Sequence, residues 1–170
     1  MTIFETQRLV VRQLTEGDAE NFYILNSDPE VMRYIRAPKT RIQATQFLLD
    51  NIDYYEDFPV FGRWALVEKA NNQFIGSFML RPSVLIENRT ELGYAMFRHR
   101  WGQGFATESV KGGLEYAFGT LKLPSVIAIT QKDNMASKKV LLKSGFTQID
   151  NVKDQGRIVN LFSLSNESQS

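Results

Sequence analysis

Apolar and polar residues are distributed along the chain in two periodicities, which predict strands and helices in turn. Short runs rich in β-branched and aromatic residues, bounded by turn-forming residues, are typical of strands. The predicted strands are residues 8–14, 64–68, 74–80, 91–97, 125–130, 146–152 and 157–164. Apolar residues at spacings of three and four predict helices. The predicted helices are about residues 15–25, 29–34, 40–57, 106–121 and 134–145.

The order of these segments predicts an α/β fold. It is a single mixed, mostly antiparallel sheet of six to seven strands, flanked by about four helices. The 170 residues contain no repeat and no linker-like stretch, so one domain over residues 1–170 is expected. Asn134 and Gly145 are the expected start and end signals of the last helix.

The stretch from Glu91 to Thr107, ELGYAMFRHRWGQGFAT, changes character halfway. Its first half has the apolar and aromatic content of a buried strand. Gly102 and Gly104 then interrupt the pattern before a helix starts at Ala106. Glycines let backbone N–H groups approach a ligand, and a helix N-terminus attracts negative charge. The stretch therefore predicts an anion site whose ligand is a phosphate or pyrophosphate.

Two common phosphate-binding motifs do not fit this turn. A Walker loop requires Gly-Lys-Ser/Thr after four intervening residues, and the chain contains no such run. The dinucleotide motif G-x-G-x-x-G requires glycine where Thr107 stands and an acidic residue about 20 positions further on, where the chain reads LKLPSVIAIT. The same glycines would also suit close packing of a helix on a sheet, so a structural interpretation stays open.

The turn WGQGFA, from Trp101 to Ala106, resembles the acetyl-CoA pyrophosphate turn Gln/Arg-x-x-Gly-x-Gly/Ala of the GNAT superfamily of N-acetyltransferases. Trp101 stands at the Gln/Arg position, which is similar to the ribosomal-protein N-terminal acetyltransferase (Rim-type) branch. Further segments resemble that branch in the same order: TQRLVVR at 6–12, DAE at 18–20, DPEVMRY at 28–34, Asn134-x-x-Ser137 and KSGF at 143–146. The resemblance implies the GNAT fold, in which the sheet splays between its central fourth and fifth strands.

The resemblance also implies how acetyl-CoA is bound, without a metal ion. Turn N–H groups would hold the pyrophosphate, and main-chain groups of the preceding strand would bond the pantetheine arm. Asn134 would contact the coenzyme while it caps its helix. The residues implied in coenzyme binding are Ala95, Met96, Phe97, Trp101, Gly102, Gln103, Gly104, Phe105, Ala106, Thr107, Asn134, Ser137 and Lys138. Lys138 and Lys139 are equally compatible with an exposed helix face.

Two residues are candidates for acid–base chemistry. An amine must be neutral to attack a thioester, and Glu91 at the head of the central strand can remove its proton. Alternation puts Glu91, Gly93 and Ala95 on one face, which leaves room in front of the carboxylate. Many superfamily members have a tyrosine general acid where this chain has Leu141. Ser137 is the nearest replacement for that proton donor by position. The structural alternative for Glu91 is a solvated charge at a strand end, and the alternative for Ser137 is a solvated serine on a helix.

Composition narrows the classes of function. The net charge of +1 provides no overall field for nucleic acid or an anionic membrane, and no apolar run approaches a membrane span. The chain has no cysteine, which excludes an acyl-cysteine intermediate and favours direct transfer. Its one histidine, His99, argues against a histidine-based metal site. Together with an N-terminus that lacks signal-peptide features, this composition predicts a cytoplasmic protein. A monomer or a homodimer is expected.

A basic group, Arg33, Arg36, Lys39 and Arg41, lies where the resemblance places the acceptor-side loop. It suits either an acidic peptide or polar acceptor, or a solvated surface. The sequence predicts an acetyl-CoA-dependent N-acetyltransferase that acts on a primary amine, such as a protein N-terminal α-amine, in a ternary complex. The alternatives are a small-molecule amine acceptor (a polyamine or an amino sugar) and a coenzyme-binding module without catalysis.

Overall fold

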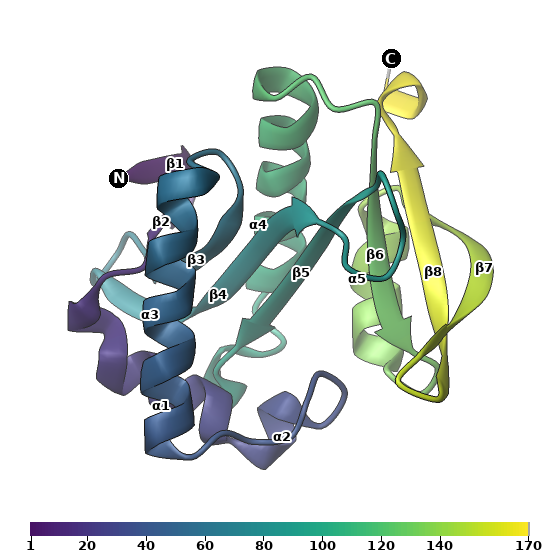
Figure 1. Cartoon of the computed structure of the whole chain (residues 1–170). Helices are drawn as coiled ribbons and strands as arrows, with labels where there is room; N and C mark the ends of the chain where they lie inside the picture. Colours follow the sequence, from purple (N-terminus) through teal and green to yellow (C-terminus); the bar gives the residue numbers. More distant parts are fainter. Residues whose placement is uncertain (170) are drawn as a thin grey trace.

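The computed structural model describes residues 1–169 and contains one mixed sheet of eight strands (Figure 1). The strands are β1 (Thr2–Glu5), β2 (Leu9–Gln13), β3 (Gly62–Glu68), β4 (Gln73–Pro82), β5 (Thr90–Met96), β6 (Ser125–Gln131), β7 (Thr147–Asp154) and β8 (Arg157–Ser165). Their order across the sheet is β1-β2-β3-β4-β5-β6-β8-β7. Neighbouring strands are antiparallel except β5 and β6, which are parallel. The predicted α/β class and mixed, mostly antiparallel sheet are confirmed.

The sheet has one strand more than the upper number expected. β1, with the sequence TIFE, is too short to show a periodicity, and it joins the sheet through antiparallel pairing with β2. Because this strand comes first, the expected splay lies between β5 and β6 rather than between the fourth and fifth strands. The predicted central strand, residues 91–97, corresponds to β5.

Five α-helices flank the sheet in the described part of the chain: α1 (Ala19–Ser27), α2 (Pro29–Met32), α3 (Arg41–Asp57), α4 (Phe105–Glu115) and α5 (Met135–Lys143). α1, α2 and α3 cover one face, and α4 and α5 cover the other (Figure 1). The strand residues below each set are apolar and buried, so the sheet is the shared floor of two cores. Within residues 1–169, no helix combines the length and apolar content needed to cross a membrane.

The predicted end signals of α5 are confirmed. The Asn134 side chain accepts a hydrogen bond from the N–H of Ser137, and Gly145 has a φ of 98° just beyond the helix. The chain then turns back, because the N–H of Phe146 donates to the carbonyl of Leu141 and the Phe146 ring is buried. These contacts fix where α5 begins and ends.

β5 and β6 are paired only at their beginnings. Glu91 lies opposite Ile127 and Leu92 opposite Ala128, and the two strands then diverge (Figure 1). The edge of β5 that faces β6 is therefore open beyond Leu92. β5 leads into α4 and β6 leads into α5, so both helices begin at the carboxyl ends of two parallel strands, where open α/β sheets bind ligands.

Candidate active site

The turn before α4 leaves backbone N–H groups without partners among residues 1–169. Gly102 and Gly104 have φ values of 71° and 83°, and Gly104 caps the helix without a side-chain hydrogen bond. The N–H of Glu108 donates to the carbonyl of Gly104 at 3.0 Å. The N–H groups of the first helical turn, residues 105–107, have no acceptor one turn earlier in the helix. They provide hydrogen-bond donors at the positive end of the helix dipole, which suits an anion.

Helix–sheet packing does not explain these two glycines. A Cβ at Gly102 would meet nothing within 4 Å, and a Cβ at Gly104 would meet the flexible Nη2 of Arg8 at 3.3 Å. Close packing is instead a property of Gly112 and Gly113, whose Cβ positions would overlap Phe4, Thr6 and Phe78. Gly102 and Gly104 are needed for their positive φ values, which shape the turn.

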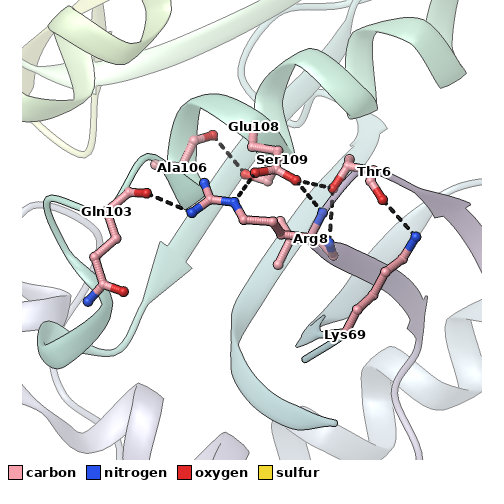
Figure 2. A network of polar contacts seen from close by, with 8 residues as sticks. Thr6, Arg8, Lys69, Gln103, Ala106, Glu108 and Ser109 are labelled. Carbon is pink, nitrogen blue, oxygen red and sulfur yellow. Dashed lines mark hydrogen bonds and ion pairs between the residues drawn. The ribbon is translucent and has the colours of Figure 1, made fainter. Parts of the chain in front are cut away.

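Arg8 and Glu108 tie this turn to the start of β2 (Figure 2). Arg8 donates through Nε to Glu108 at 2.6 Å and through Nη1 to the carbonyl of Gln103 at 3.0 Å. Glu108 also accepts from the hydroxyl of Thr6 at 2.6 Å and from the N–H of Arg8 at 2.7 Å. Burial opposes ionisation of Glu108, but the hydrogen bonds from Thr6 and Arg8 outweigh it and lower the pKa. The TQR segment near the N-terminus therefore holds the turn in place.

The open edge of β5 presents main-chain groups from alternate residues. The N–H of Phe97 donates to the carbonyl of Ile75 in β4, so by alternation the N–H groups of Tyr94 and Met96 point toward β6. The carbonyl of Met96 accepts from the indole Nε1 of Trp101 at 3.0 Å, and the carbonyl of Phe97 accepts from the N–H of Arg100 at 2.9 Å. Of the predicted strand residues, Met96 offers a free N–H to the opening, and Phe97 is engaged within the sheet.

The start of α5 brings Asn134 and Ser137 to the other side of the opening. The Oδ1 of Asn134 accepts from the N–H of Ser137 at 3.2 Å. The hydroxyl of Tyr94 donates to the Oγ of Ser137 at 3.4 Å, and burial raises the pKa of Tyr94. Leu141 is buried in the core. Sequence reasoning missed Tyr94, because its partner lies 43 positions away and no local pattern joins them.

Glu91 lies at the closed end of the opening, on the opposite face of β5 from Tyr94. Its Oε2 accepts from the hydroxyl of Ser83 at 2.8 Å, and Arg81 faces it across the β4–β5 pair. Burial raises the pKa of Glu91, although the Ser83 hydrogen bond and the charge of Arg81 moderate the shift. A raised pKa makes the carboxylate a stronger base than an exposed glutamate.

The basic group expected at the acceptor side divides into two pairs. Arg41 forms an ion pair with Glu20 at 2.6 Å, and Arg33 is exposed against the ring of Tyr34. Arg36 and Lys39 instead line a pocket of about 490 Å³ on the α3 side of the sheet. The interpretation as solvated surface therefore applies to Arg33 and Arg41, and it does not apply to Arg36 and Lys39.

Several features of the opening fit a long, amide-containing coenzyme. Thr130 lies on β6 beyond the pairing with β5, and its buried hydroxyl has no hydrogen-bond partner among residues 1–169. Trp101 is 49% exposed beside the turn. An uncapped helix start, an open strand edge and an unpartnered hydroxyl together match a pyrophosphate followed by pantetheine amides. In the described part of the chain, no group of three or more potential metal-ligating side chains occurs.

The family is shown by sequence comparison. The family model described as acetyltransferase (GNAT) domain matches residues 8–147. The uncharacterized N-acetyltransferase YoaA of Bacillus subtilis is 32% identical over 146 residues, which cover 85% of this chain and 82% of that protein. FsC-acetyl coenzyme A-N(2)-transacetylase of Aspergillus fumigatus is 34% identical over 154 residues, 85% of this chain and 65% of that protein. The chain belongs to the GNAT acetyltransferase family and is an acyltransferase that uses acetyl-CoA.

Solved structures confirm the GNAT fold. A GNAT-family acetyltransferase from Bacillus anthracis superimposes with a TM-score of 0.85 at 21% identity, covering 98% of this chain and 99% of that chain. Spermidine N-acetyltransferase from Vibrio cholerae, in complex with coenzyme A and spermine, has a TM-score of 0.78 at 18% identity over 95% and 97% of the chains. The ribosomal L7/L12 α-N-protein acetyltransferase RimL, in complex with coenzyme A, has a TM-score of 0.80 at 16% identity over 97% and 98%. Similar folds thus serve protein and small-molecule acceptors.

Proposed function

We propose that the protein binds acetyl-CoA between β5 and β6 and transfers the acetyl group directly to a primary amine in a ternary complex. The observation that carries the proposal is the open edge of β5 beside the uncapped start of α4. Acetyl-CoA supplies a thioester, whose carbonyl carbon is the electrophile. N–H groups of Tyr94 and Met96 would polarise that carbonyl. Much of the rate enhancement would come from positioning the two substrates.

The contacts proposed for the coenzyme follow the geometry of the opening. The pyrophosphate would lie on the N–H groups of residues 103–107, with Trp101 and Gly102 shaping the turn. Asn134 can contact the pantetheine arm through its amide nitrogen, since its Oδ1 already caps α5. Lys138, partly buried on the same helix, can reach the phosphates of the adenosine end.

The proposed reaction needs a base and a stabiliser of the leaving group. Glu91 takes a proton from the bound ammonium, directly or through a water molecule, and the neutral amine that results attacks the thioester carbonyl carbon. A C–N bond forms as the C–S bond breaks, and the electron pair of that bond goes to the sulfur. Ser137 would donate a hydrogen bond to the sulfur from the α5 side, since its hydroxyl accepts from Tyr94 and its own proton is free to donate.

Ser137→Ala and Tyr94→Phe should each lower kcat about tenfold and change KM for acetyl-CoA less. Burial raises the pKa of Tyr94 above its ordinary value near 10, whereas the pKa of a thiol is near 8.5. Hydrogen bonding to the thiolate is therefore favoured over full proton transfer, so the effect should lie at the lower end of acid catalysis. Because the two residues act as one unit, the double variant should be little slower than either single one. Steady-state thiol release measures these rates, and unchanged kcat in both single variants would remove the pair from the mechanism.

Asn134→Ala should have two separable effects. Loss of the cap should lower the free energy of unfolding by about 1 kcal/mol, and loss of the amide should raise KM for acetyl-CoA. Asn134→Ser is the matched control, because serine can cap the helix but is too short to make the same coenzyme contact. If Asn134→Ser and Asn134→Ala both keep the normal KM, Asn134 acts as a cap and nothing more.

The acceptor is either a protein N-terminal α-amine, as the Rim-type resemblance suggests, or a small amine. Both kinds of acceptor occur among the structural neighbours. Thiol release from acetyl-CoA, measured with a panel of N-terminal peptides and small amines, tests the proposed transfer. Acetylation of at least one amine, verified by mass spectrometry, is the expected result. Tight coenzyme binding without turnover on any amine would favour a coenzyme-binding module.

A further inference from the structure

The pocket of about 490 Å³ lies between the segment after α2 and the first turns of α3. Arg36, Lys39, Phe47 and Asp50 are among its lining residues. Its size is in the range of small-molecule sites. The reaction steps proposed above use none of these side chains.

Three cationic groups gather around the ring of Phe47. The Nζ of Lys39 lies 4.6 Å from the ring centroid, the Cζ of Arg36 5.0 Å and the Cζ of Arg63 5.4 Å. An aromatic ring attracts cations through its quadrupole but carries no net charge. The ring therefore holds the three groups together without neutralising them.

Arg63 is the most deeply buried of the three, with 8% of its surface exposed. Its Nε has no hydrogen-bond partner among residues 1–169, and its Nη2 donates to the Sδ of Met79 at 3.4 Å. Burial, with repulsion from Arg36 and Arg81, lowers the pKa of Arg63 to about 9. The guanidinium is thus still charged at neutral pH. A buried charge with an unmade hydrogen bond is unfavourable unless a ligand completes it.

Five arginines have carboxylate partners among the described residues, whereas Arg36, Arg63 and Arg81 near the pocket have none. Ion pairs of 2.6 to 2.9 Å are made by Arg8, Arg12, Arg41, Arg98 and Arg100. Arg36 donates instead to the neutral Oδ1 of Asn26 at 3.0 Å. In the described part of the chain, no carboxylate oxygen lies within 4.0 Å of a nitrogen of Arg36, Arg63 or Arg81.

Two more distant carboxylates offset only part of this charge. Asp50 interacts with Lys39 and accepts from Gln46 at 2.8 Å, and Glu91 interacts with Arg63 and Arg81 and accepts from Ser83. Two acids, Asp50 and Glu91, therefore stand against four cations. The cations are Arg36, Lys39, Arg63 and Arg81. Arg36 and Lys39 line the pocket, and Arg63 and Arg81 add their charge from outside its lining, so the excess of positive charge favours a negative ligand.

We propose that this pocket binds an oxyanion of the acceptor, so that the acceptor is a primary amine that also carries a carboxylate or a phosphate. The inference rests on the proposed function, because it specifies the acceptor of that reaction. Guanidinium groups bind both anions through paired, charge-assisted hydrogen bonds. Arg81 lies opposite Glu91 in the sheet, so the anion site and the proposed base share one face. A polyamine would instead add positive charge to a group that already lacks counter-ions.

Four amines that share an aminoethyl group test the charge preference: β-alanine, O-phosphoethanolamine, ethanolamine and ethylenediamine. We expect kcat/KM, measured by thiol release, to be about tenfold or more higher for at least one of the two anionic amines than for ethanolamine, with ethylenediamine slowest. The order of β-alanine and O-phosphoethanolamine identifies which anion the pocket prefers. Equal rates, or a preference for ethanolamine or ethylenediamine, would overturn the inference.

A binding measurement covers the case in which these amines are too small to react. The Nε–H nuclear magnetic resonance signal of Arg63, assigned by through-bond correlation, should shift saturably with β-alanine or O-phosphoethanolamine and not with ethylenediamine. Arg36→Gln should weaken that binding about tenfold. Arg33→Gln, an exposed position three residues earlier, should leave it unchanged. Absence of a shift with either anion would overturn the inference.

The two proposals fail in different ways. Anion binding at Arg63 without acetylation of any amine would remove the proposed function and leave the anion site in place. Acetylation with no preference for anionic amines and no shift at Arg63 would leave the function and remove the site.

Discussion

Replacing Gly104 with valine should raise the Kd for acetyl-CoA on the order of 100-fold, the equivalent of one to two charge-assisted hydrogen bonds. The added side chain would stand at the cap of α4, beside the free N–H groups of residues 105–107. It would also press on the Nη2 of Arg8, which lies 3.3 Å from the Cβ position, and so disturb the bond from Arg8 to Gln103. Calorimetric titration with acetyl-CoA measures the change.

Gly156→Val is the matched control for backbone strain. Gly156 has a φ of 80°, close to the 83° of Gly104, and a Cβ there would meet nothing within 4 Å. Both valines should destabilise the fold by about 1–2 kcal/mol, because a β-branched residue is strained at positive φ. Gly156→Val should bind acetyl-CoA normally. A folded Gly104→Val variant with normal affinity would mean that the pyrophosphate does not lie on this turn.

Glu91→Gln should lower kcat/KM on the order of 100-fold at neutral pH and leave acetyl-CoA affinity unchanged. The amide preserves the shape of the side chain but cannot take a proton from the amine. Because burial raises the pKa of Glu91, the wild-type rate should be full above that pKa and fall as the pH drops through it. The defect of the variant should shrink as the pH rises, since neutral amine becomes abundant without a base. Thiol release across a pH series measures both trends.

Glu87→Gln is the matched control for Glu91→Gln. Glu87 lies four positions earlier and is exposed, so its substitution should change neither the rate nor the pH profile. A near-normal kcat/KM for Glu91→Gln at neutral pH would mean that solvent or another residue accepts the proton. The carboxylate of Glu91 would then serve only as a partner of Ser83 and the nearby arginines.

The local patterns of the sequence predict most of the fold, because each longer strand and helix carries its own periodicity. SVIAIT is short and rich in β-branched residues, which predicts a buried strand, and it forms β6. The Asn134 cap and the Gly145 turn place α5 to within a residue or two. β1 could not be predicted in the same way, because four half-exposed residues show no period and depend on β2 for their conformation.

The site could be predicted only where it is local in sequence. The glycine turn and the start of α4 are contiguous in sequence, so the segment WGQGFAT is enough to predict an anion site. The bond between Arg8 and Glu108 spans 100 positions, and the pair of Tyr94 and Ser137 spans 43. Arg63 lies in β3, whose sequence pattern predicts only a packed strand. Its contact with the ring of Phe47 depends on how α3 crosses β3. Such contacts follow from the tertiary arrangement and have no local signal.

Hydrogen exchange with and without acetyl-CoA tests the central claim most directly, namely that the coenzyme lies between β5 and β6 and on the first turn of α4. Saturating acetyl-CoA should slow amide exchange at residues 94–96 and 102–107 and leave β7, at the far edge of the sheet, unchanged. Protection at these two segments would place the coenzyme as proposed. Protection confined to other segments, or none at saturation, would contradict the account.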